Sequence, residues 1–210
     1  MVIQELKPSK RVEGRWLAVL EDGSILRLGE GEVIDFALYT GKELSDEEGE
    51  ALMACVRRSG LKEKALELLT RKPQSRRQLE KKLEQWGSSE EETAAICDRM
   101  EALGYLNDAA YAAMVVRHYG AKGFGVKKLR DELYLRGVPR ELWDDALEQA
   151  EDPAEALDAF VAKKLAGKTP DRKELKKVSD ALARRGYSWS DISAALSRYA
   201  AETECEEDFL

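Results

Sequence analysis

The sequence has few of the residues on which metal sites and nucleophilic catalysis depend. Its 210 residues include one histidine, His118, and three widely spaced cysteines. A single imidazole leaves little scope for Ser–His or Cys–His catalysis, and scattered cysteines do not match the paired spacing of zinc sites. No pair of carboxylates has a second partner that would imply acid–base catalysis. We therefore expect a protein that is not an enzyme and that uses no metal or cofactor.

Long apolar runs are also missing. None approaches the roughly 18 residues of a membrane-spanning helix, and the first residues lack the apolar core of a secretory signal. The cysteines, Cys55, Cys97 and Cys205, are odd in number and far apart. A disulfide framework is therefore not indicated, and a reducing compartment is favoured. We expect a cytoplasmic monomer with no membrane partner.

Charge is what the sequence has in excess. Charged residues make up 36% of the chain, although the net charge is only −7; an average protein has roughly 25%. Basic blocks at 71–82, 117–136 and 163–185 alternate with acidic blocks at 84–101 and 141–152. Solvated helix faces and a surface for an anionic partner both account for this alternation, and the sequence leaves the choice open.

The first 45 residues differ from the rest. Two β-rich runs, 15–20 and 24–28, flank Asp22-Gly23, which predicts a hairpin. The run 33–38 fits either a short helix or a strand. Ser45 followed by Glu48 is a capping box, which predicts a helix that ends at about Arg58.

After residue 60 the caps and stops predict nine helices in groups of three. A leucine four residues before a glycine recurs at spacings of 50 and 49 residues, in the pairs Leu83/Gly87, Leu133/Gly137 and Leu182/Gly186. One helical turn before each leucine lies a further apolar residue: Leu79, Leu129 and Val178. Each group therefore contains two amphipathic helices that meet at a tight turn.

The predicted fold is mainly α: three tandem three-helix repeats forming an elongated, curved molecule, preceded by a short N-terminal β-hairpin region. We divide the chain into the hairpin region (1–45), a connecting helix (46–60), three repeats (61–107, 108–151 and 152–200) and an acidic tail (201–210). We expect the last helix to end near Ala200 and the tail to be disordered.

The basic residues fall at the same place in each repeat, before and along its second helix. These candidate partner- or DNA-binding residues are Arg76, Arg77, Lys81 and Lys82; Arg117, Lys122, Lys127, Lys128 and Arg130; and Arg172, Lys173, Lys176 and Lys177. Gly123-Phe124-Gly125 before Lys127 and Lys128 places backbone N–H groups and cations at a helix start. That arrangement suits an anion, although a lone Gly-x-Gly is weak evidence and a flexible cap is the favoured interpretation. Among the tryptophans, Trp143 is predicted to be core, and Trp86 and Trp189 stay open.

The sequence resembles the RecX family of recombination regulators over about residues 12–200. The motifs that carry the resemblance are Ser75-Arg-Arg-Gln-Leu-x-x-Lys82-Leu, Gly104-Tyr-Leu-Asn-Asp-x-x-Tyr111-Ala, Arg117, and Lys122-Gly-x-x-x-x-Lys128-Leu-x-x-Glu132-Leu-x-x-x-Gly137-Val. The resemblance implies three tandem three-helix repeats, which agrees with the period of about 50 residues.

The resemblance also implies a role in DNA repair, homologous recombination and the SOS response. Family members bind the RecA recombinase filament on single-stranded DNA and usually inhibit its ATPase, strand-exchange and coprotease activities, without being enzymes. Weaker contacts with single- or double-stranded DNA are expected. Two other hypotheses stay open: a helical DNA-binding module that acts without RecA, and a non-enzymatic helical adaptor.

Overall fold

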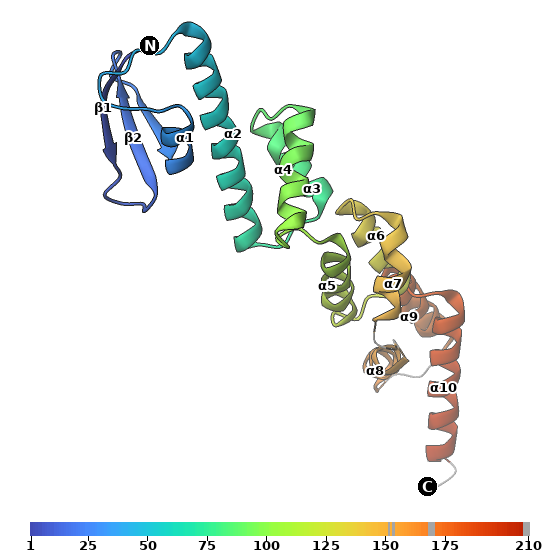
Figure 1. Ribbon diagram of the computed structural model, residues 1–210. Coiled ribbons are helices and arrows are strands. Elements are labelled where there is room, and N and C mark those ends of the chain that lie inside the picture. The colour runs from blue at the N-terminus through green and yellow to red at the C-terminus, as the bar shows by residue number, and fades with distance from the viewer. Residues whose placement is uncertain (151, 153, 168–170, 208–210) are drawn as a thin grey trace. The chain divides into compact units, whose positions relative to one another are not determined.

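The computed structural model describes residues 1–150, 152, 154–167 and 171–207. The described chain is mostly helical, with one small antiparallel sheet near the N-terminus (Figure 1). It forms two compact units: Met1–Lys72 with Glu80–Tyr105, and Pro73–Leu79 with Leu106–Leu210. The mainly helical prediction is therefore confirmed.

The N-terminal sheet has three strands rather than the two of the predicted hairpin. The strands are β1 (Ile3–Pro8), β2 (Arg15–Leu20) and β3 (Ile25–Gly29), paired in that order. The hairpin of β2 and β3 is confirmed, and β1 adds to it because alternation places Ile3 in the core beside Ala18 and Leu28. Helix α1 (Glu30–Asp35) follows β3.

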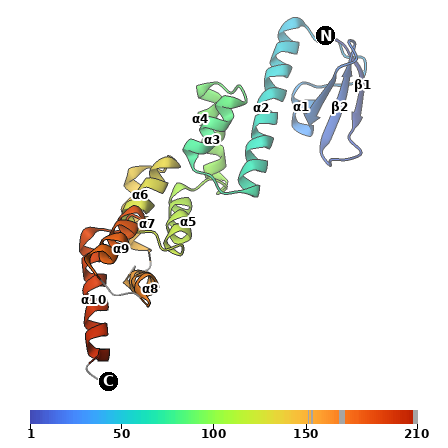
Figure 2. The same cartoon turned by 180° about the vertical axis from the view of Figure 1, so that it is seen from behind.

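Helix α2 (Asp46–Arg71) begins at the predicted capping box of Ser45 and Glu48. The predicted end near Arg58 is wrong, because the helix continues through Gly60. An internal glycine costs only about 1 kcal/mol, and burial of Leu61 and Ala65 in the following turns offsets that cost. The sheet and α1 lie on one side of α2, and α4 lies on the other (Figures 1 and 2).

The remaining helices follow the predicted grouping. They are α3 (Arg76–Gln85) and α4 (Glu90–Ala102); α5 (Asp108–Gly120), α6 (Val126–Leu135), the 3-10 turn η1 (Arg140–Leu142) and α7 (Trp143–Glu148); and α8 (Ala154–Leu165), α9 (Arg172–Arg184) and α10 (Trp189–Glu207). The predicted helix end near Ala200 is wrong, since α10 continues to Glu207. Alanine and glutamate, which dominate 200–207, are good helix formers. Of the predicted disordered tail, residues 208–210 lie outside the described residues.

The repeat read from the sequence is confirmed by burial. Each predicted apolar pair on the second helices is at most 4% exposed: Leu79 and Leu83, Leu129 and Leu133, Val178 and Leu182. The three stop glycines have φ of +85°, +68° and +88° at Gly87, Gly137 and Gly186. Glycine adopts this left-handed conformation without strain, so each second helix ends where the sequence predicts.

Candidate partner interface

In each three-helix repeat, the turn between the second and third helices accepts a hydrogen bond from an element earlier in the chain. Arg57 of α2 donates to Gly87 O at 3.3 Å. The hydroxyl of Ser75, just before α3, donates to Arg136 O. The N–H of Gly125, just before α6, donates to Arg185 O at 2.9 Å. These contacts fix the ends of the helices that carry the candidate cations.

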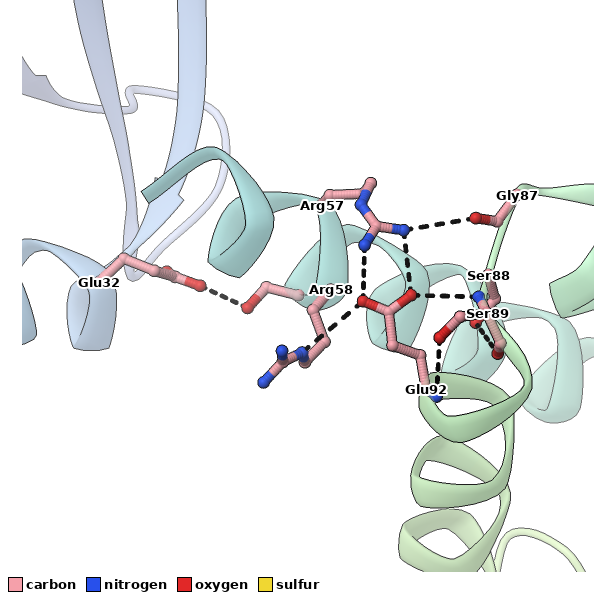
Figure 3. Close-up of polar contacts among 8 residues, drawn as sticks. Glu32, Arg57, Arg58, Gly87, Ser88, Ser89 and Glu92 are labelled. Atoms are coloured by element: carbon pink, nitrogen blue, oxygen red, sulfur yellow. Dashed lines mark hydrogen bonds and ion pairs between the residues drawn. The ribbon is translucent and has the colours of Figure 1, made fainter. Parts of the chain in front are cut away.

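The first of these turns is held by an arginine–carboxylate pair (Figure 3). Arg57 donates to both oxygens of Glu92, at 2.6 and 3.0 Å, and Glu92 also caps α4 by accepting the Ser89 N–H at 3.2 Å. The Ser89 N–H, followed by Arg57, holds the pKa of Glu92 below its ordinary value. The α4 cap is therefore tied to α2. The same view includes Glu32, which accepts a hydrogen bond from the Ser59 hydroxyl of α2.

Two backbone donors at the start of α6 bond to the turn at Gly186. The N–H of Gly125 is bonded to Arg185 O, and the N–H of Lys127 donates to Gly186 O at 3.1 Å. A Cβ on Gly186 would lie 2.4 Å from the backbone nitrogen of Lys128, which shows how closely the two segments approach. The N–H groups of Gly123 and Phe124 donate to carbonyls at the end of α5, so Gly123–Gly125 has no free backbone donor for the anion cradle considered from the sequence.

Three candidate cations occupy equivalent repeat positions. Arg77, Lys127 and Lys176 each precede a buried apolar residue by two positions, which places them on the opposite side of the helix, and all three are exposed. Arg77 also packs its aliphatic stem against Gly137: a Cβ there would lie 2.6 Å from Arg77 Cγ. In the described chain, neither Lys127 nor Lys176 has an acidic partner.

Several of the other candidate cations have acidic partners. Lys128 lies 3.0 Å from Glu132, Arg130 lies 3.3 Å from Asp144, and Lys177 pairs with Glu174. Lys82 donates to Gln85, and the Lys122 ammonium lies 5.2 Å from the Tyr119 ring centroid. Exposed candidates for which the described residues show no ion pair are Lys81, Arg117, Arg172 and Lys173. The N–H of Arg76 donates to Asp108 at 2.8 Å, which anchors the start of α3.

Glu132 is the most enclosed carboxylate among these cations, at 8% exposure. It accepts hydrogen bonds from Lys128 and Arg136, and Arg136 also donates to the Tyr119 hydroxyl at 2.8 Å. Burial pushes the pKa of Glu132 upward, but the hydrogen bonds from Lys128 and Arg136 outweigh burial and hold it below its ordinary value. Glu132 thus stays ionised and binds both Lys128, near the start of α6, and Arg136, at its C-cap.

The sequence reasoning missed Arg57, Arg136 and Arg185. Arg136 and Arg185 each stand directly before a stop glycine, a local signal that could have been found. The Arg185 guanidinium lies 4.5 Å from the Phe160 ring centroid and 3.4 Å from Gly123 O. Trp143 packs partly buried in the second domain's core, as predicted, whereas Trp189 is 73% exposed.

Among the described residues, no cluster of His, Cys, Asp and Glu could hold a metal ion. Within the same residues, no helix is long and apolar enough to cross a membrane.

Three family models match the chain: RecX, first three-helix domain at 62–100, second at 107–147 and third at 150–196. The regulatory protein RecX of Pseudomonas entomophila is 33% identical over 63% of this chain and 87% of its own length. The chain belongs to the RecX family. The RecX of Streptomyces coelicolor is 37% identical over 68% of this chain and 78% of its own length.

Solved RecX structures share the fold. A crystal structure of regulatory protein RecX matches with a TM-score of 0.74 at 24% identity, over 94% of this chain and all of its own. A crystal structure of RecX from Lactobacillus salivarius matches with a TM-score of 0.60 at 22% identity, over 68% of this chain and 96% of its own. Both likenesses concern the fold, while the regulatory family follows from the sequence matches.

Proposed function

We propose that this member of the RecX family binds the RecA filament on single-stranded DNA and inhibits its ATPase, strand-exchange and coprotease activities. Membership of a family of regulatory proteins carries the proposal. The effect is one of binding rather than of a catalytic step. If several three-helix domains contact the filament at once, their weak contacts would combine into a high overall affinity without a single dominant site.

The contacts we assign first are those of Lys127 on α6 and Lys176 on α9. Both are exposed, occupy equivalent positions and have no acidic partner in the described chain. Lys128, Arg130 and Lys177 contribute less, since an acidic neighbour already neutralises each of them. Exposed cations of this kind act on association and salt dependence more than on folding.

The test is ATP hydrolysis by the cognate RecA on single-stranded DNA, titrated with the full chain at physiological salt. We expect inhibition at well below one molecule per RecA, which favours capping of filament ends. No inhibition at excess would contradict the proposal. Binding to DNA alone that falls steeply with salt, without an effect on RecA, would favour the DNA-binding module instead.

Charge reversal assigns the surface. Lys127→Glu and Lys176→Glu should each raise the half-inhibitory concentration a few-fold, and the double variant should raise it by about tenfold or more because multivalent contacts multiply. Lys163→Glu, an exposed cation on α8 outside the candidate set, is the matched control. Equal inhibition by all variants, with unchanged helicity, would remove these faces from the interface.

A further inference from the structure

The N-terminal sheet carries a basic pocket that the family's three-helix domains do not include. One face of the sheet packs its apolar side chains into the core, so alternation places Leu17 and Arg27 on the other face. Lys7, Leu17 and Arg27 are direct cross-strand neighbours in β1, β2 and β3. On this open face, Leu17 therefore lies between two cations, Lys7 and Arg27.

This pocket, which we call the sheet pocket, has a volume of about 680 Å³. Among the described residues, its lining holds no acidic side chain and five cations: Lys7, Lys10, Arg11, Arg15 and Arg27. Lys7 pairs with Glu5 and Arg15 pairs with Glu63, and neither glutamate lines the sheet pocket. For the other three cations the described residues show no ion pair. The sheet pocket is therefore a site of concentrated positive charge in a chain whose net charge is −7.

Exposed aliphatic side chains accompany this charge. Ile25 is 58% exposed and Val12 is 41% exposed, and both line the sheet pocket beside Leu17. The loop that carries Lys10 and Arg11 is held in place: the Ser9 hydroxyl accepts the N–H groups of Arg11 and Val12, each at 3.3 Å. Such fixing lowers the entropy cost of binding a partner.

We propose that the sheet pocket binds an acidic peptide segment that carries an aliphatic side chain. The carboxylates would accept hydrogen bonds from the arginines and lysines at the rim, and the aliphatic side chain would pack on Leu17 and Ile25. Single-stranded nucleic acid fits less well because base stacking uses aromatic side chains. None of the described aromatic residues lines the sheet pocket, and the neighbouring Trp16 packs against the core.

The proposal goes beyond inhibition of RecA and stands on different residues. The matched family domains begin at residue 62, whereas the sheet pocket lies entirely within 7–27. Failure of the RecA proposal would leave this surface unaffected, and the reverse also holds. The two are tested with separate probes.

The experiment measures fluorescence anisotropy of a short labelled peptide of alternating glutamate and leucine, titrated with the full chain. The comparison probes are the same peptide with serine in place of leucine, and oligothymidylate. We expect the leucine peptide to bind most tightly. Lys7→Glu/Arg27→Glu should weaken its binding about tenfold through lost charge complementarity, and Ile25→Ser about threefold through lost apolar contact.

Lys62→Glu, an exposed cation of α2 outside the sheet pocket, is the matched control and should bind like the wild type. Circular dichroism confirms that each variant is folded. Equal binding by wild type and the double variant would overturn the proposal. Oligothymidylate binding that exceeds peptide binding and falls in the same variants would also overturn it, and would assign the sheet pocket to nucleic acid.

Discussion

The turns at Gly87 and Gly186 have the same backbone conformation in different surroundings. Their φ angles are +85° and +88°. In the part of the chain that the structure describes, a Cβ at Gly87 would meet nothing within 4 Å, whereas one at Gly186 would lie 2.4 Å from the backbone nitrogen of Lys128. The first turn therefore needs glycine only for its φ angle. The third needs it for φ and for the close approach of another helix.

Gly137 lies between these extremes. A Cβ there would lie 2.6 Å from Arg77 Cγ and 2.7 Å from Arg77 Cβ. The obstacle is a side chain, which can move in part, rather than a backbone. One sequence signal, a glycine four residues after a leucine, thus marks three turns at which replacing the glycine should lower the free energy of unfolding by different amounts.

The largest effect is expected for Gly186→Ala. The left-handed φ costs about 1–2 kcal/mol and the backbone overlap about 2 kcal/mol more, so the free energy of unfolding should fall by about 3–4 kcal/mol. Urea denaturation followed by circular dichroism measures it. Gly167→Ala is the matched control, since its φ is +69° and a Cβ there meets none of the described residues within 4 Å. Equal losses in the two variants would show that packing against Lys128 contributes nothing.

Gly137→Ala should cost less, about 2–3 kcal/mol, because the Arg77 stem can shift. A double-mutant cycle sharpens this comparison. Arg77→Gly removes the obstructing atoms, so the double variant should lose less stability than the two single variants combined. Additive losses would mean that Arg77 and Gly137 do not obstruct each other.

The sequence predicts the helical repeat because each stop glycine and apolar pair is a local signal. It does not predict that α2 is continuous, since Ser59-Gly60 resembles a stop and burial of Leu61 overrides it. The exposed cations Lys127 and Lys176 follow from helical spacing. The occupation of backbone donors at the start of α6 does not, because the position of Gly186 against α6 is a long-range contact. The Lys128–Glu132 pair, by contrast, is an i, i+4 contact that helical spacing could have predicted.

Glu132→Gln tests how much the hydrogen bonds that Glu132 accepts from Lys128 and Arg136 stabilise the fold. The substitution removes a charge that accepts two charge-assisted hydrogen bonds, so we expect a loss of about 2 kcal/mol at neutral pH. The pKa of Glu132 lies below its ordinary value of 4.5 in the folded chain. Its stabilising contribution is therefore complete above pH 4.5 and is lost as pH falls through the folded-state pKa.

Wild type and Glu132→Gln should accordingly converge in stability under acid conditions. Urea denaturation at a series of pH values measures this convergence. Asp131→Asn is the control, because its side chain is exposed and the described residues show no hydrogen bond to it. A constant gap between wild type and Glu132→Gln at every pH would mean that the lost contribution is steric rather than ionic.

Gly87→Ala should have the smallest effect in the series, about 1 kcal/mol, from backbone strain alone. The Arg57 hydrogen bond is made to the carbonyl of Gly87, so a methyl group at this position leaves it in place. Thermal unfolding of this variant beside Gly186→Ala measures the difference. A loss as large as that of Gly186→Ala would place the whole cost in turn geometry. A small loss would mean that close packing requires glycine only at the turns against which another segment packs, and that at Gly87 only the positive φ requires it.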